Sequence, residues 1–363
     1  MSVLPPRLGP YRVRSIVGVG GMGTVAAAVH DHLGRDVALK ARAREALDDD
    51  EPLLYERFRV GARLQASLSH PHVAQVFDYF ETDAYQVAVL ELLEGGSVET
   101  LLEDGQALSV ADAAQVALGA ADALSYAHAR GLVHRDIKPG NLLLRSARAP
   151  GTVQVTDFGV ARALDTTSDL TVAGANVGTL WYMPPEQFNH EAPTPLVDVY
   201  ALGATTYEML TGHIPFREAS HAELFRRFLD RQPPPPLRDR NPQVSALVAA
   251  VVEQALAVDV ADRIPSVEVF ATWLKAALAG SAARATLDEK LAEDAEAARL
   301  RAVEALGCLP RAHRGALSDA LGASGARITE QPTPVAPARV PASIDDDDDD
   351  DRTLVGSVFG EDD

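Results

Sequence analysis

The chain has 363 residues, of which 52 are acidic and 33 basic, and its formal net charge is −19. This balance excludes most nucleic-acid binders, which present basic surfaces, and a single cysteine, Cys308, excludes a disulfide framework. The first residues lack the basic and apolar segments of a signal peptide, and the most apolar run is too short to span a bilayer. We therefore expect a cytoplasmic protein with neither nucleic-acid nor membrane partners.

The first ninety residues are rich in β-compatible runs that are separated by turn residues. Strands are predicted at 11–18, 23–31, 35–41, 73–82 and 85–93. A helix is predicted from Glu56 onward, with Gly61 in its middle, although a glycine costs a helix ~1 kcal/mol relative to alanine. Residues 97–130 and 196–280 have helical periodicity. The pattern predicts an α+β protein with a small β-rich lobe (11–93), a hinge near 92–96 and a larger helical lobe (94–280).

The C-terminal part changes character in three steps. Residues 281–326 are expected to form a helical extension, residues 327–343 a proline-rich linker, and residues 344–363 an acidic, disordered tail. Asp345 to Asp351 are an unbroken run of seven aspartates, and Thr353 follows in this acidic context. The tail is either a solubilising end or a docking segment in which phosphorylated Thr353 is recognised by a forkhead-associated domain.

A glycine-rich segment lies between the first two predicted strands. The sequence "GVGGMGTV" places Gly18, Gly20 and Gly23 at G-x-G-x-x-G spacing, and glycines allow backbone N–H groups to approach phosphates closely. A simple glycine hairpin would show the same pattern, whereas a dinucleotide site is disfavoured because the motif does not open a helix. Lys40 of "DVALK" follows on the next strand. It is either an edge lysine with its ammonium in solvent or a ligand of phosphate oxygens.

The segment "VHRDIKPGN" decides between these alternatives, because it gathers basic, acidic and amide side chains within nine residues. Its Asp136 and Asn141, together with Asp157 of "TDFG", provide oxygen ligands for a metal ion. The chain has only four lysines, and two of them, Lys40 and Lys138, occur in these motifs. A compact ammonium beside a phosphate gives a physical reason for lysine there.

From about Tyr11 to Leu278 the chain resembles the eukaryotic-like (Hanks-type) bacterial serine/threonine protein kinases. The resemblance implies a bilobal protein kinase fold over residues 11–280, with ATP and Mg²⁺ as cofactors and Ser/Thr hydroxyls of proteins as substrates. It implies that Asp136 accepts the hydroxyl proton, that Lys138 neutralises the transferring phosphoryl group, and that Asn141 and Asp157 bind Mg²⁺. The residues implied to contact ATP are Gly18, Val19, Gly20, Gly21, Met22, Gly23, Val25, Ala38, Lys40, Leu90, Glu91, Leu93 and Leu143.

Further motifs extend the resemblance. Glu186 of "MPPEQ" is expected to pair with Arg263, and Asp198 of "DVYALG" to brace the segment "VHRDIKPGN" (residues 133–141), which the resemblance identifies as the catalytic loop. Arg135 resembles the arginine of kinases that are regulated by a phosphate on the activation loop. The candidate phosphorylation sites are hydroxyl residues of that loop, each of which is otherwise simply solvated: Thr166, Thr167, Ser168 and Thr171. The motifs that contain Lys138 and Thr179, "DIKPGN" and "GTLWY", resemble those of serine/threonine kinases and not those of tyrosine kinases.

One position departs from the family pattern. The family carries a glutamate nine residues before the "HP" pair, where it pairs with the strand lysine, but Gly61 stands there in this chain. Four residues further on, where an apolar residue is usual, stands Gln65. Glu56 lies about 140° around the helix from Gly61 and cannot replace the missing carboxylate without a shift or rotation. The alternative to an active enzyme is therefore a pseudokinase, a nucleotide-binding scaffold with slow or no transfer.

Overall fold

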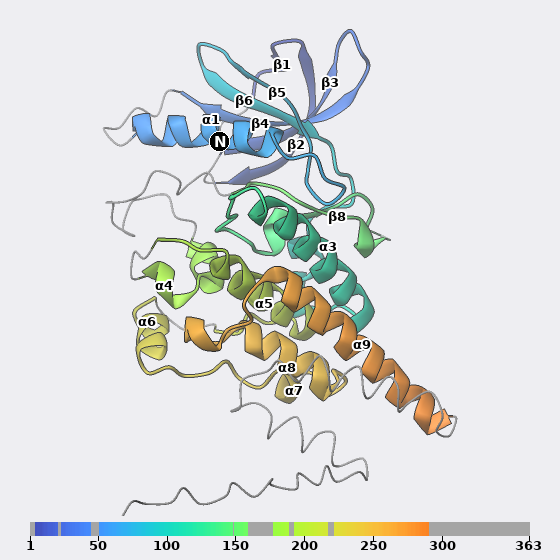
Figure 1. The fold of residues 1–363 in the computed structure, drawn as a ribbon. Coiled ribbons are helices and arrows are strands. Elements are labelled where there is room, and N and C mark those ends of the chain that lie inside the picture. The colour runs from blue at the N-terminus through green and yellow to red at the C-terminus, as the bar shows by residue number, and fades with distance from the viewer. Residues whose placement is uncertain are drawn as a thin grey trace, which may run out of the picture.

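The computed structural model describes residues 4–20, 23–44, 51–147, 149–158, 177–188, 192–216 and 221–289. A twisted sheet with one long helix stands above a larger helical part (Figure 1). This arrangement confirms the predicted α+β, two-lobed protein kinase fold. The predicted linker and tail, and the predicted helical extension beyond residue 289, lie outside the described residues.

The upper part is an antiparallel sheet of six strands in the order β1-β2-β3-β4-β6-β5. The strands are β1 (Arg7–Leu8), β2 (Tyr11–Gly20), β3 (Gly23–His30), β4 (Asp36–Ala43), β5 (Val76–Glu81) and β6 (Tyr85–Glu91). All five predicted strands are therefore confirmed, and the short β1 adds to them at the β2 edge. The side chains of β3 alternate in burial, so that Ala26 and Ala28 pack into the core with Leu39 of β4.

Helix α1 (Glu51–Ala66) is longer than expected, because it begins five residues before Glu56. Pro52 falls in the first turn, where the N–H that proline lacks would have no partner within the helix. Gly61 lies inside this helix and is buried. Glu56 is engaged by the helix itself, since its carboxylate lies 2.6 Å from the guanidinium of Arg59. Gly61 thus lies within α1 as predicted. Glu56 does not replace the glutamate that the family carries at position 61.

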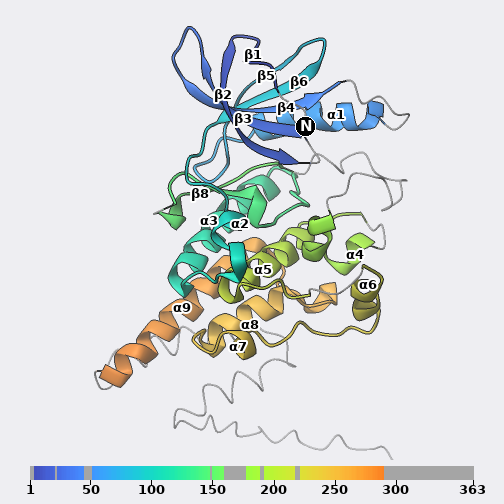
Figure 2. The same ribbon diagram turned by 180° about the vertical axis from the view of Figure 1, so that it is seen from behind.

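The lower part is a bundle of helices around one continuous apolar core (Figure 2). The helices are α2 (Val98–Leu101), α3 (Val110–His128), α4 (Pro185–Phe188), α5 (Leu196–Thr211), α6 (His221–Leu229), α7 (Leu237–Arg240), α8 (Ala246–Ala255) and α9 (Val267–Glu289). The short 3-10 helices are η1 (Glu103–Gly105), η2 (Pro139–Asn141), η3 (Pro150–Thr152), η5 (Val177–Tyr182) and η6 (Val260–Asp262). Helix α9 runs through Gly280 without a break. None of the helices in the described ranges combines the length and apolarity needed to cross a bilayer.

Helix α5 forms the centre of this bundle, because nearly all of its residues are buried. It packs closely on α8, and a Cβ at Gly203 would lie only 2.8 Å from the Cβ of Ala255. A larger residue at position 203 would therefore push the two helices apart. The rigid placement of α5 matters for function, since its first turn carries Asp198 below the predicted catalytic loop.

A short backbone junction connects the two parts. The strands β7 (Leu142–Leu144) and β8 (Val153–Val155) form a hairpin on the helical side. Val155 donates its N–H to His72 O at 2.8 Å and accepts the N–H of Ala74 at 2.9 Å. The segment between α1 and β5 is thereby bonded to the strand that leads into Asp157.

The predicted ion pair between Glu186 and Arg263 is confirmed. The Arg263 guanidinium binds the carboxylate in a two-pronged contact, with nitrogen–oxygen distances of 2.5 and 3.0 Å. Both residues are buried, and Arg263 also donates to Ala257 O and Leu196 O. The pair therefore joins α4, the start of α5 and the loop before α9.

We expect Arg263→Met to lower the free energy of unfolding by about 3–5 kcal/mol, because it leaves the Glu186 carboxylate buried without its counter-charge. Urea denaturation of the purified protein measures this loss. Arg231→Met is the matched control, since Arg231 pairs with Asp259 at 3.1 Å but is 74% exposed; we expect it to cost less than about 1 kcal/mol. Equal losses in the two variants would contradict this account of the Glu186 pair.

Candidate active site

The glycine-rich turn connects strands β2 and β3. Gly18, Val19 and Gly20 are exposed at the end of β2, while Gly21 and Met22 lie outside the described residues. Gly23 has a φ of +121°, and a Cβ there would lie 2.4 Å from Ala41 O. Only glycine fits this close approach of β3 to β4, so the last glycine of the motif is required by the sheet itself.

The predicted adenine-contacting residues come from neighbouring strands and from the hinge. Ala38 of β4 lies opposite Leu90 of β6, and Val25 of β3 lies opposite Lys40. Leu143 belongs to β7, which is bonded to the hinge through a bridge to Ser97. The sheet register thus places Ala38 beside Leu90 and Val25 beside Lys40 on neighbouring strands, and the bridge places Leu143 beside the residue that follows the hinge.

The remaining hinge residues follow directly. Glu91 ends β6 and Leu93 follows it in the hinge. The Glu91 carboxylate lies 2.5 Å from a guanidinium nitrogen of Arg145. This ion pair ties the end of β6 to the segment after β7, which fixes the hinge against the helical part.

Lys40 and Asp157 meet across the two parts of the molecule. The Lys40 Nζ lies 2.7 Å from Asp157 Oδ1, and the two side chains are 15% and 27% exposed. Burial of the Asp157 carboxyl acts to raise its pKa, but the Lys40 ammonium acts in the opposite direction and prevails, so that this pKa lies below its ordinary value. Asp157 is therefore ionised at neutral pH and presents a carboxylate beside an ammonium.

The predicted catalytic loop is held from below by a fully buried carboxylate. Asp198 accepts hydrogen bonds from the backbone N–H groups of His134 and Arg135, at 2.8 and 2.7 Å. His128 Nε2 lies 2.7 Å from the same carboxylate. Arg135 has a φ of +69°, a conformation that costs a non-glycine residue free energy and needs support. The buried acceptor provides that support, which confirms the predicted bracing role of Asp198.

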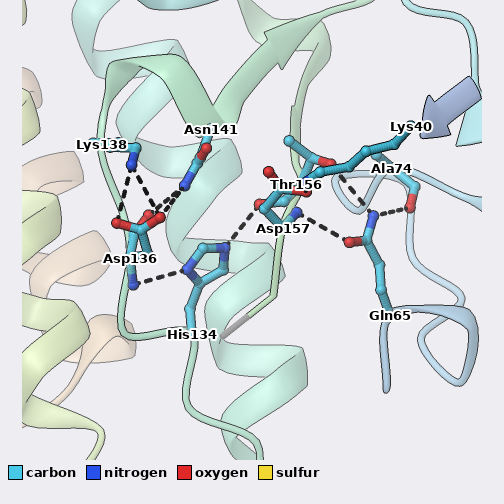
Figure 3. Close-up of polar contacts among 9 residues, drawn as sticks. All are labelled: Lys40, Gln65, Ala74, His134, Asp136, Lys138, Asn141, Thr156 and Asp157. Carbon is cyan, nitrogen blue, oxygen red and sulfur yellow. Dashed lines mark hydrogen bonds and ion pairs between the residues drawn. The ribbon is translucent and has the colours of Figure 1, made fainter. Parts of the chain in front are cut away.

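Asp136, Lys138 and Asn141 form one hydrogen-bonded cluster on this loop (Figure 3). Lys138 Nζ lies 3.2 and 3.0 Å from the two carboxylate oxygens of Asp136. Asn141 Nδ2 donates to the backbone oxygen and to Oδ2 of Asp136, at 2.6 and 2.9 Å. His134 accepts the Asp136 N–H at Nδ1 (3.2 Å) and donates from Nε2 to Thr156 O (2.9 Å). His134 therefore links the catalytic loop to the strand end that carries Asp157.

The donor set of Asn141 and Asp157 fits a hard cation such as Mg²⁺, which prefers oxygen ligands. Because the amide nitrogen of Asn141 is committed to Asp136, the amide oxygen is the atom through which a cation would bind. The described residues contain no group of three or more histidine, cysteine, aspartate or glutamate side chains that could hold a metal ion.

Gln65 is a site residue whose contacts the sequence did not reveal. It is 4% exposed in the last turn of α1. Its Nε2 donates to Ala74 O at 2.8 Å, and its Oε1 accepts the backbone N–H of Asp157 at 3.0 Å. A polar residue at a position where the family usually has an apolar one was the available signal, but the partners follow only from the tertiary structure.

The predicted regulatory residues are placed in part. Arg135 lies on the braced loop, as described above. The backbone of Thr179 lies in η5. The candidate phosphorylation sites Thr166, Thr167, Ser168 and Thr171 lie outside the described residues, as does Thr353.

Comparisons with known proteins agree with this geometry. The family model for the protein kinase domain matches residues 11–274. The chain is 38% identical over 280 residues to the serine/threonine-protein kinase PknA of Mycobacterium tuberculosis, covering 75% of this chain and 62% of PknA. It is 37% identical over 276 residues to the serine/threonine-protein kinase Pkn1 of Myxococcus xanthus, covering 75% of this chain and 39% of Pkn1.

A solved structure is similar as well. The crystal structure of the PknI kinase domain of Mycobacterium tuberculosis matches with a TM-score of 0.59 at 26% identity, covering 77% of this chain and 100% of that one. The chain spans about 62% of the length of PknA, so the likeness concerns the kinase domain. By its sequence, its fold and the arrangement of its site, the chain belongs to the protein kinase family.

Proposed function

We propose that the protein is an ATP-dependent serine/threonine protein kinase that transfers the γ-phosphoryl group of ATP to Ser/Thr hydroxyls of proteins, including its own. The observation that carries the proposal is the contact between Lys40 and Asp157 at 2.7 Å, next to a catalytic loop that is braced by a buried carboxylate. A lysine from the sheet, which would contact phosphate, and an aspartate from the helical side, which would bind Mg²⁺, are thus held next to each other.

The proposed roles follow from these contacts. Lys40 would bind phosphate oxygens of ATP, and Val25, Ala38, Leu90 and Leu143 would contact its adenine ring. Asp136 orients the substrate hydroxyl and accepts its proton, and Lys138, within 3.0 Å of Asp136, offsets the negative charge of the phosphoryl group. Asn141 and Asp157 would hold Mg²⁺, which when bound would neutralise charge on the phosphates.

The pseudokinase alternative is disfavoured by the same residues. Lys40, Asp136, Asn141 and Asp157 are all present, and each lies in the contacts described above. The family's helix carboxylate is missing at Gly61. This is expected to lower the rate of transfer without removing the site, because Lys40 has Asp157 as a carboxylate partner. The cytoplasmic location, the absence of nucleic-acid and membrane partners, and docking of phosphorylated Thr353 to a forkhead-associated domain stay predictions from the sequence.

Incubation of the purified protein with γ-labelled ATP and Mg²⁺ tests the proposed function. Label is expected on the protein itself and on a generic protein substrate, on serine and threonine. Asp157→Ala is the control and is expected to take up no label. Absence of label in both proteins would contradict the proposal.

Asp136→Asn is expected to lower turnover by at least ~100-fold, the range of a lost general base. Its affinity for ATP should stay nearly unchanged, because Asp136 contacts Lys138 and Asn141 on the loop and is proposed to face the hydroxyl, not the nucleotide. Turnover is measured with the labelled ATP assay and affinity by calorimetry. Wild-type turnover in this variant would mean that the catalytic loop has been assigned incorrectly.

Phosphate on the activation loop is expected to pair with Arg135 and to order the segment between Asp157 and Glu186. Mass spectrometry of the active protein should find phosphate on at least one of four residues, with Thr171 favoured: Thr166, Thr167, Ser168 and Thr171. Phosphatase treatment should lower the transfer rate. A fully active protein without any of these phosphates would leave Arg135 with a structural role only.

Gly61→Glu is expected to raise the transfer rate, because a carboxylate at this buried position of α1 restores the pair with Lys40 that orients it for charge developing late in the reaction. Gly61→Ala restores only the helix propensity, ~1 kcal/mol, and so separates the two effects. Steady-state kinetics of the three proteins gives the comparison. Equal rates for glycine, alanine and glutamate would show that position 61 does not face Lys40.

A further inference from the structure

Gln65 adds a side-chain link between two backbone segments that are already joined by backbone hydrogen bonds at Val155. On one side lies Ala74, in the segment between α1 and β5, and on the other lies Asp157, after β8 (Figure 3). The Gln65 side chain reaches both from the last turn of α1, and its Nε2 also lies 3.5 Å from Thr156 Oγ1. It is therefore a direct polar link between the helix and the backbone of the proposed metal residue.

The chemistry of this link is specific to a neutral amide. The Ala74 carbonyl needs a donor and the Asp157 N–H needs an acceptor, and one side chain that is 4% exposed supplies both. An apolar side chain of the same size would leave both backbone groups without these partners in a buried place. A carboxylate would still accept the Asp157 N–H, but it would face the Ala74 carbonyl with a second acceptor.

The bond to Asp157 falls on a strained residue. Asp157 has a φ of +63°, in the left-handed region that non-glycine residues adopt at a cost. Arg135, the other such residue in the site, has a φ of +69°, and its N–H is accepted by the buried Asp198. Both strained positions in the site are thus supported in the same way, by a buried side-chain oxygen that accepts the backbone N–H.

We propose that Gln65 is a positioning residue for phosphoryl transfer: it holds the Asp157 backbone in its left-handed conformation and couples α1 to the active site, a coupling that the family otherwise obtains from the carboxylate missing at Gly61. This proposal rests on the proposed kinase function. It concerns the orientation of Asp157, whereas the proposed function concerns the reaction that the protein catalyses.

The test compares Gln65→Met with the wild type in two readouts. Amide hydrogen exchange of residues 153–158, followed by mass spectrometry, should become roughly tenfold faster at Asp157, because its acceptor is lost. The kcat of transfer should fall roughly five- to tenfold, as for one hydrogen bond of ordinary strength, while the KM for ATP changes less than about twofold. This split arises because Gln65 touches the Asp157 backbone and none of the proposed nucleotide contacts.

Gln86→Met is the matched control. Gln86 is also a buried glutamine that bonds α1, since its Nε2 donates to Tyr55 O at 3.2 Å, but its other partner is the hydroxyl of Tyr79 at 2.8 Å. The same substitution there should lower the melting temperature and leave both Asp157 exchange and kcat within about twofold of the wild type. Equal losses of kcat in the two variants would overturn the proposal, because the effect would then come from helix packing in general.

Gln65→Glu keeps the proposal testable if the methionine variant fails to fold. It retains an acceptor for the Asp157 N–H, so exchange at Asp157 should stay slow and kcat should fall less than in a variant without an acceptor. Fast exchange at Asp157 with an unchanged kcat would overturn the proposal. If the wild type transfers no phosphate, the kinase function fails, whereas unchanged Asp157 exchange in Gln65→Met would refute the role of Gln65 independently.

Discussion

The buried carboxylate of Asp198 is the interaction on which the rest of the site depends. A carboxyl group with no exposed surface is stable only when its oxygens have hydrogen-bond partners, and Asp198 bonds two backbone N–H groups of the proposed catalytic loop and His128. Those bonds fix the loop in a conformation that includes a left-handed Arg135. Because Asp198 stands in the first turn of the buried helix α5, the loop inherits the rigidity of the whole helical core.

Short polar contacts connect this loop to the sheet. His134 connects the loop to Thr156 O, and Val155 connects the strand to His72 and Ala74. The bonds of Val155 join backbone groups only, whereas the link to Thr156 depends on the imidazole of His134. The sheet and the helical part are therefore joined near the residues of the proposed active site, where a small displacement would have the largest effect on the proposed transfer.

The sequence was sufficient for the strands of the sheet and for locating the motif residues to which we assign the proposed chemistry. Short alternating runs and closely spaced motifs depend on local properties, and the structure brings Lys40, Asp136, Asn141 and Asp157 into one region as those motifs predicted. The start of α1 was placed too late, because the acidic residues before Glu56 mask a helical turn that begins at Glu51. The contacts of Gln65 were beyond prediction, since Ala74 and Asp157 are 9 and 92 positions away and meet it only through the fold.

Gly61 and Gln65, the two residues of α1 that depart from the family pattern, have a common physical explanation. A lysine–carboxylate link between helix and strand depends on two charges and is weakened by salt and by changes of protonation, whereas the Gln65 link is neutral and acts on the backbone. With glycine at position 61, Asp157 is a carboxylate that offsets Lys40, and the ammonium keeps the pKa of Asp157 low against the opposing effect of burial. Asp157 thus has two duties, towards the lysine and towards the proposed cation, and its backbone must stay in a left-handed conformation while its charge is shared. Holding that backbone from α1 with an uncharged amide leaves the carboxylate oxygens free to exchange partners without moving the helix.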